Sequence, residues 1–287
     1  MIQWPNELVE DIARRKSIIF LGAGVSMNST NAAGRRPKSW NAFLTDAIVN
    51  IRPNQHIKSL IKRNDYLTAC EIVKKELGRE GFTTIVLDEY LTPGYIHAPI
   101  HDSIYRLDSR IVMSPNFDKI YETRANAIAN GTIQVKNYYD NDVAESIRRS
   151  NRVIIKAHGS IDQTDKMIFS RTEYSNAKIE NRNFYSIFEA LIITNSFIFI
   201  GCGLNDPDVR LLLEDYSQKF KCARNHYFII PKKTIHAAEM AVIENALNLK
   251  FLTYSRDNHH QELSDSLAAL DTIVDLKRDE LSRNMNW

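Results

Sequence analysis

The 287-residue chain has few cysteines, no long apolar run and almost no net charge. Its three cysteines, Cys70, Cys202 and Cys222, lie far apart, so the sequence offers no disulfide framework and no Cys-x-x-Cys zinc module. No apolar stretch approaches the roughly 20 residues that a membrane helix needs, and the opening MIQWPNELVE lacks the pattern of a signal peptide. Lys and Arg number 37 against 35 Asp and Glu, which gives no basic footprint for nucleic acid. We expect a cytoplasmic protein without bound metal that contacts neither membranes nor nucleic acid directly.

Short apolar runs alternate with segments of helical periodicity along most of the chain. The seven runs that we expect to form strands are residues 17–21, 110–113, 132–135, 152–155, 197–200, 227–230 and 250–253. The helices expected around them are residues 5–15, 117–129, 184–193, 208–219, 235–247 and 260–276. This alternation predicts an α/β fold with a Rossmann-like, mostly parallel sheet that carries helices on both faces.

One segment breaks the alternation. Residues 40–107 contain no convincing strand and carry apolar stripes at helical spacing, such as Leu67, Cys70, Val73 and Leu77. We interpret this segment as a helical insertion that follows the first strand and its loop.

The stretch SIIFLGAGVS, residues 17–26, joins the first predicted strand to a glycine-rich turn. Gly22 and Gly24 allow the backbone to turn tightly and to approach a ligand closely. Such strand-to-loop turns are common phosphate sites in α/β proteins, because their free amides attract anions. A full dinucleotide fingerprint would need a third glycine at Met27, and no Lys-Ser/Thr pair follows, so this is no triphosphate P-loop. A tight turn between core elements explains this stretch alone equally well.

Glycines or polar side chains suited to ligand binding follow four of the predicted strands. In sheets of this kind, ligands bind outside the carboxyl ends of the strands. The candidates are Gly22, Ala23, Gly24 and Ser26 after the first strand, Ser114, Asn116 and Asp118 after the second, His158 after the fourth, and Gly201, Gly203 and Leu204 after the fifth. Taken singly, Asn116 and Asp118 could cap a helix, and His158 could be a buried core histidine. Their convergence at successive strand ends favours a ligand site.

The order of these motifs resembles the NAD-binding domain of the sirtuin family. The chain shows GAGVS, then Asn-x-Asp after a strand, then a strand-terminal His-Gly, then Gly-x-Gly-Leu in the place of Gly-x-Ser-Leu. The resemblance spans Ser17 to about Leu267 and includes a final FLTYSRDNHHQELSDSL similar to the family's last strand and helix. It implies a single NAD-binding domain over residues 1–287, with residues 40–107 inserted in it.

Three departures from the protein-deacylating sirtuins matter. The four-cysteine zinc ribbon of those enzymes cannot be built here. Their Gly-Ile-Pro-Asp-Phe-Arg segment is replaced by MNSTNAAGRRPKSW, and their Thr-Gln-Asn-Ile-Asp motif reads Ser-Pro-Asn-Phe-Asp at residues 114–118, so Gln is lost. The helical insertion and PKSWNAFL, residues 37–44, are more similar to sirtuin-like domains of bacterial anti-phage effectors, which hydrolyse NAD.

The resemblance implies a role for each candidate. NAD's pyrophosphate would lie against Gly22, Ala23 and Gly24 with Ser26 as a donor, and Gly201 and Gly203 of the Gly-x-Gly-Leu motif, which ends at Leu204, would admit its ribose-phosphate part. Asp118 would bind the nicotinamide carboxamide, in the motif that Ser114 opens. Asn116 suits an attacking water, since an amide both donates and accepts hydrogen bonds. His158 would be the general base, because imidazole titrates near cellular pH.

We therefore expect an NAD glycohydrolase that depletes NAD in anti-phage defence and that a partner or a nucleotide signal gates. The resemblance implies a sensor or effector partner protein and a higher-order oligomer. Two alternatives stay open at this point. One is a sirtuin-type protein deacylase or ADP-ribosyltransferase, and the other is a non-catalytic nucleotide-binding subunit of an assembly.

Overall fold

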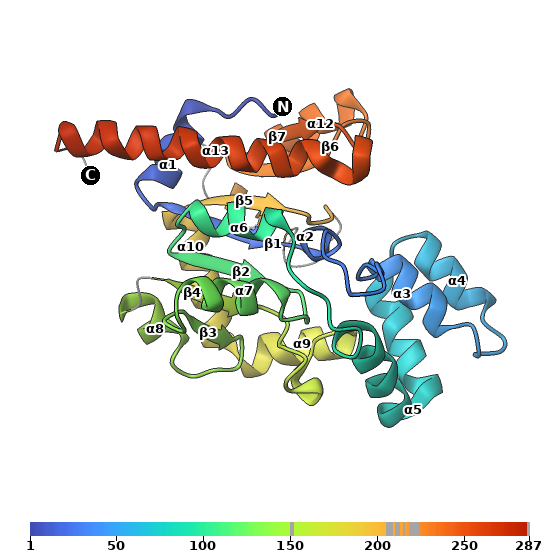
Figure 1. The fold of residues 1–287 in the computed structure, drawn as a ribbon. Helices are drawn as coiled ribbons and strands as arrows, with labels where there is room; N and C mark the ends of the chain where they lie inside the picture. The colour runs from blue at the N-terminus through green and yellow to red at the C-terminus, as the bar shows by residue number, and fades with distance from the viewer. Residues whose placement is uncertain (150–151, 205–208, 210–212, 215, 218–223, 286–287) are drawn as a thin grey trace.

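The computed structural model describes residues 1–149, 152–204, 209, 213–214, 216–217 and 224–285. Within them, seven strands form one sheet in which every pairing is parallel (Figure 1). The strands are β1 (Ser17–Leu21), β2 (Ile111–Ser114), β3 (Gln134–Asn137), β4 (Val153–Lys156), β5 (Ser196–Ile200), β6 (His226–Pro231) and β7 (Leu249–Tyr254). They lie in the order β3-β4-β2-β1-β5-β6-β7, so β1 stands between β2 and β5.

Helices cover both faces of this sheet. In the described part of the chain the helices are α1 (Asn6–Ala13), α2 (Ala23–Ser26), α3 (Trp40–Ala47), α4 (Gln55–Lys62), α5 (Tyr66–Tyr90), α6 (Pro99–Arg106), α7 (Ile120–Ile128), α8 (Val143–Arg149), α9 (Arg171–Glu180), α10 (Arg182–Thr194), α12 (Ala237–Leu247) and α13 (Asp257–Arg283), with a short 3₁₀ turn, η1, at Thr164–Lys166. Two of the longest helices are interrupted by left-handed backbone, α5 at Gly78 and α13 at residues 258–260.

The central strands β1, β2, β4 and β5 are buried because both of their faces are covered, whereas the edge strand β3 is polar and partly exposed. Successive side chains of a strand point to opposite faces. In β1, Ile19 and Leu21 join one hydrophobic cluster with residues of α1, α6 and α13, whereas Ile18 and Phe20 join a second cluster with residues of α10. All five residues of β1 are buried, as expected for a central parallel strand.

A third hydrophobic cluster lies beyond the sheet's carboxyl end and is formed mainly by α3, α4 and α5, which stand apart from the sheet in Figure 1. Residues of the loops after β2 and β4, among them Phe117 and Phe169, complete it. Helix α6 behaves differently, because it contributes Ile100 and Ile104 to the first cluster and packs against α13 and α7. The helices of residues 40–107 thus serve two separate cores.

The fold class predicted from the sequence is confirmed, and all seven predicted strands are present with ends shifted by one or two residues. The helix expected from residue 117 begins at Ile120 instead, and α8 and α9 were not predicted. The helix expected at 208–219 lies largely outside the described residues. In the described part of the chain no helix is both long and apolar enough to cross a membrane. Cys70 and Cys202 are free thiols.

Candidate active site

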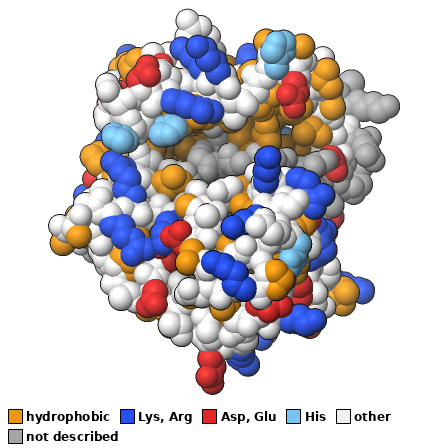
Figure 2. Space-filling model, turned by 90° about the vertical axis from the view of Figure 1, so that its right-hand side faces the viewer, with side chains coloured by type: hydrophobic (Ala, Val, Ile, Leu, Met, Phe, Trp, Pro, Cys, Tyr) orange, Lys and Arg blue, Asp and Glu red, His pale blue; other side chains and the backbone are white. Residues whose placement is uncertain are grey.

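The candidate site lies where the order of the strands reverses. After β1 the chain adds β2 and then β4 and β3 on one side of β1, and it later adds β5, β6 and β7 on the other side. A crevice at the carboxyl ends of such strands is the usual ligand site of open α/β sheets. Figure 2 looks at the side toward which the strands point, and it shows a hollow surface with Lys and Arg side chains around it.

The glycine loop after β1 packs directly on the loop after β5. The Gly22 amide donates to the Ile200 carbonyl over 2.9 Å, and the Gly24 amide donates to the Gly201 carbonyl over 2.9 Å. A Cβ atom on Gly22 would stand 2.4 Å from the Gly201 carbonyl oxygen, and one on Gly24 would stand 2.8 Å from the Gly201 Cα. Gly201 itself has φ +68°. These three glycines are therefore required by the contact between the two loops.

Two residues of these loops, Ala23 and Gly203, take no part in the contact between the loops that the described residues make. The Ala23 amide makes no hydrogen bond to any described residue, whereas the amides of Gly22 and Gly24 are already paired. A Cβ on Gly203 would meet no atom within 4 Å among the described residues. Of these three amides, only that of Ala23 lacks a partner among the described residues, and no described atom crowds Gly203. Leu204, which follows, packs partly buried against the second cluster.

A chain of hydrogen bonds joins the loops after β1 and β2. The Asn116 side-chain amide donates to Ser26 Oγ over 3.1 Å, and the Ser26 hydroxyl donates to Asp118 Oδ2 over 2.8 Å. Ser114 connects the end of β1 to the loop after β2, because its hydroxyl donates to the Leu21 carbonyl and accepts a hydrogen bond from the Asn116 backbone amide. Ser26, Ser114 and Asp118 are buried, and Asn116 is partly exposed. The structure therefore brings these four predicted residues together, with Asn116 at the accessible end.

Asp118 also performs the capping role that its sequence context allows. Its Oδ1 accepts the Ile120 amide at the start of α7, while its Oδ2 holds Ser26. Both carboxylate oxygens thus have a partner within the protein, one at the start of α7 and one in the glycine loop.

A buried ion pair lies beneath Asp118. Lys156, the last residue of β4, is 1% exposed, and its ammonium donates to the Asp118 carbonyl over 2.5 Å and to Glu122 Oε2 over 3.0 Å. Burial raises the pKa of Glu122 above its ordinary value, against the opposing pull of Lys156. Neither residue was among the predicted site residues. A signal was present, since a lysine that ends a strand covered on both faces must find a buried partner.

His158 follows β4 and is buried, with 5% of its surface exposed. Its ring lies 6.5 Å from the Phe117 ring and meets Tyr174 of α9 edge-on at 6.3 Å, measured between centroids. Its carbonyl accepts the Ile168 amide. Gly159 follows with φ +83°, and a Cβ there would stand 2.8 Å from the Lys166 carbonyl oxygen. The backbone of the His-Gly turn is thereby fixed on both sides of the imidazole.

Phe117 links the site to α3, α4 and α5. It stands between Asn116 and Asp118 in the chain, and its ring stacks on Phe169 with centroids 4.0 Å apart. Trp40 of α3 and Tyr90 of α5 meet the same ring edge-on at 6.2 Å. The helical segment thus contacts the predicted catalytic loop through one buried side chain.

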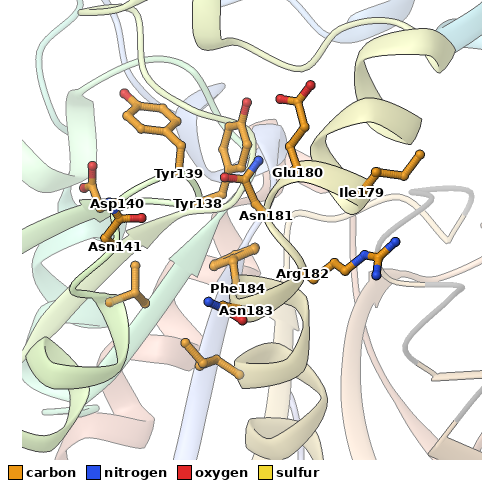
Figure 3. A pocket seen from close by; sticks show the side chains of 12 residues that line it. Tyr138, Tyr139, Asp140, Asn141, Ile179, Glu180, Asn181, Arg182, Asn183 and Phe184 are labelled. Atoms are coloured by element: carbon orange, nitrogen blue, oxygen red, sulfur yellow. The ribbon is translucent and has the colours of Figure 1, made fainter.

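A polar pocket of about 170 Å³ lies elsewhere, beyond β3 (Figure 3). It is lined by residues 138–141 and 143 and by residues 179–184 and 187 around the junction of α9 and α10. None of these is a predicted site residue, so the pocket lies apart from the candidate site. Among the described residues, no group of three or more His, Cys, Asp and Glu side chains could hold a metal ion.

The chain is similar in sequence to several known proteins. The family described as "SIR2-like domain" matches residues 110–254, about half of the chain. The chain is 22% identical over 230 residues to "NAD(+) hydrolase ThsA" of Acinetobacter baumannii, covering 79% of this chain and 45% of that protein. It is 24% identical over 229 residues to the protein of the same name from Enterococcus faecium, covering 78% and 45%. It is 24% identical over 216 residues to "Defense-associated sirtuin 2" of Bacillus subtilis, covering 74% and 20%. The chain thus spans less than half the length of these relatives.

Proposed function

The chain belongs to the SIR2-like domain family, and from this premise we propose that it hydrolyses NAD to nicotinamide and ADP-ribose. The names of two relatives, "NAD(+) hydrolase ThsA", support the reaction. The name "Defense-associated sirtuin 2" supports a role in defence. The bond that breaks joins the nicotinamide nitrogen to the ribose anomeric carbon, and water supplies the new bond to that carbon.

The observation that carries the proposal is the hydrogen-bonded chain from Asn116 through Ser26 to Asp118. It joins the glycine loop to the loop after β2, so the groups assigned to the phosphates and to the reacting end of NAD share one framework. The described residues leave space beside Gly203 and make no hydrogen bond to the Ala23 amide, and both features fit a ligand with phosphates that crosses from β1 to β5.

Each polar group has a task suited to its surroundings. Asn116 is partly exposed and presents the amide that orients water, while Ser26 fixes its side chain. Asp118 is held as a carboxylate acceptor for the nicotinamide amide. His158 takes the proton from the water or from a ribose hydroxyl. Cleavage develops positive charge on the ribose, as in other glycosidic cleavages, and nicotinamide leaves as a neutral group.

Regulation of this reaction is part of the proposal. An unrestrained NAD hydrolase would harm the cell that makes it, so a partner or a nucleotide signal gates the enzyme, within a higher-order oligomer. The contact of Phe117 with Trp40 and Tyr90 supports a route for such control, because a shift of α3 or α5 would move the residue between Asn116 and Asp118.

Nicotinamide release from NAD by the purified protein tests the function. His158→Ala and Asn116→Ala are expected to lower turnover by about a hundredfold to ten-thousandfold, as loss of a base or of a positioned water does, with NAD affinity retained. The exposed His56→Ala and Asn41→Ala serve as matched controls that keep wild-type turnover.

Wild-type protein that binds NAD but releases no nicotinamide, both alone and together with its genomic neighbour's product, would show a non-catalytic subunit instead. Removal of an acyl group from a lysine peptide at a rate above that of NAD hydrolysis would favour the deacylase alternative. Unchanged turnover in His158→Ala would remove the histidine from the mechanism.

A further inference from the structure

Lys156 is the most deeply buried charged side chain near the site, and the proposed chemistry does not use it. Within β4, Val153 and Ile155 face the second hydrophobic cluster and Ile154 faces the first, so alternation turns Lys156 toward the face that α7 covers. A buried ammonium is unfavourable unless it is paired and hydrogen-bonded. Its position therefore calls for partners on α7 and its entry loop.

Those partners connect Lys156 to the reacting groups. Its ammonium donates to the Asp118 carbonyl over 2.5 Å and to Glu122 of α7 over 3.0 Å. The carboxylate of the same Asp118 accepts the hydroxyl of Ser26, which in turn accepts the amide of Asn116. Every link in this chain is a hydrogen bond between groups that are buried or partly buried, so solvent does not screen these bonds strongly.

Lys156 also lies two residues before His158 in the sequence. The backbone pairs β2 with β4 up to Ser114 and Lys156, and the Ala157 amide donates to the Ser114 carbonyl. The lysine side chain adds a second tie beyond the end of this ladder, at Asp118. One residue thereby connects the strand that carries the histidine to the loop that carries the asparagine and the aspartate.

We propose that Lys156 is a positioning residue, which fixes the backbone of Asp118 relative to β4 and so holds Asn116 and His158 in register for NAD cleavage. This inference rests on the proposed function. Glu122 balances the charge of the lysine, and it acts on the reaction only through that residue.

Replacement of the pair separates positioning from stability. Lys156→Met keeps the length of the side chain and removes its hydrogen-bond donors, but it leaves the Glu122 carboxyl buried without its cation. The double variant Lys156→Met/Glu122→Met also removes the unpaired carboxyl group. Proteins in which a buried ion pair is replaced by apolar side chains of similar size are often as stable as wild type. Asp118 lacks its lysine donor in both variants.

We expect both variants to lose about tenfold to a hundredfold in kcat while KM for NAD changes by less than about threefold, since misplacement of reacting groups lowers rate more than binding. The double variant is expected to unfold at a temperature close to that of wild type and to remain slow. Recovery of wild-type kcat in the stable double variant would overturn the proposal, because stability alone would then explain the single variant.

Arg152→Met is the matched control at the opposite end of β4. Arg152 immediately precedes β4 and pairs with Asp108, which precedes the parallel strand β2, so this ion pair lies at the other end of both strands from the catalytic loop. Its loss is expected to lower the unfolding temperature while kcat of the folded protein stays at the wild-type value. A fall of kcat equal to that in Lys156→Met would show that any damage to β4 suffices.

Hydrogen exchange of the backbone amides of residues 114–120 provides a readout that does not need turnover. Exchange in this segment should be faster in both Lys156→Met variants than in wild type and Arg152→Met. If wild type releases no nicotinamide even with its genomic neighbour's product, the proposed function fails, and this exchange still decides the positioning role. Unchanged exchange at residues 114–120 in both lysine variants would refute it.

Discussion

Substitution by alanine should affect stability at Gly24 but not at Gly203, although the two glycines lie in facing loops. In Gly24→Ala the new Cβ would stand 2.8 Å from the Gly201 Cα and 2.9 Å from its carbonyl oxygen. In Gly203→Ala it would meet no described atom within 4 Å. The two substitutions change one hydrogen to a methyl group in neighbouring loops, so the difference between them reports on their surroundings.

The magnitudes follow from those distances. Favourable carbon contacts are about 3.5–4.0 Å long, so Gly24→Ala forces the two loops apart by roughly 1 Å. Overpacking of this kind costs about 1–3 kcal/mol, which lowers the unfolding temperature by roughly 2–8 °C in a chain of this size. Gly203→Ala should lie within about 0.5 kcal/mol of wild type, as changes at open positions do. It should instead weaken NAD binding by about tenfold, because its methyl group occupies the space assigned to the ligand.

Thermal unfolding without ligand and calorimetric titration with NAD measure both quantities on the same samples. The reasoning predicts a less stable Gly24→Ala protein and a stable Gly203→Ala protein that binds NAD weakly. An unchanged unfolding temperature for Gly24→Ala would refute the packing of the two loops. Wild-type NAD affinity in Gly203→Ala would exclude the ligand from the β5 loop.

Two further predictions concern acid stability and metal content. Burial lowers the pKa of His226 to about 4, and the neutral ring accepts the Phe197 amide, so the folded protein resists protonation that the unfolded chain accepts near 6.5. The contribution of His226 to the free energy of unfolding is therefore full above pH 6.5 and falls as the pH drops toward 4, by about 2 kcal/mol between pH 7 and pH 5. Urea unfolding should show this loss in wild type and a smaller loss in His226→Gln. Equal losses in the two proteins would contradict this role of His226. We also predict that elemental analysis of the folded protein finds no stoichiometric zinc, and about one zinc per chain would revive the deacylase alternative.

Hydrophobic patterning was sufficient to predict the sheet. The central strands are short and buried on both faces, so they stand out from the amphipathic helices around them. Parallel strands also place their carboxyl ends at one edge, which is why Gly22, Asn116 and Asp118 could be expected near one another before the structure was known.

The unpredicted elements are those whose signals are polar. Helix α9 carries few apolar residues, and what starts it is the reciprocal pairing of Ser170 with Glu173, a capping box visible in the sequence as Ser-x-x-Glu. Helix α6 was grouped with its neighbours because its stripe is apolar like theirs. Nothing in that stripe indicates that it packs on α13 rather than with α3 to α5. A hydrophobic pattern in the sequence predicts that one face of a helix is buried. Only the tertiary structure shows which element that face packs against.

The glycine loop shows the same limit at the level of single atoms. Gly22 and Gly24 were selected as phosphate contacts because glycine permits close approach. The structure uses that closeness first for the backbone of Gly201, with the amides of Gly22 and Gly24 bonded to β5 and its loop. Two loops locked in this way present their remaining polar groups, such as the Ala23 amide, in a fixed geometry. Lys156 does the same for the loop after β2 with one buried charge. Both contacts pair protein with protein, so residues that the sequence suggests as ligand contacts also form the contacts that fix the loops of the proposed site.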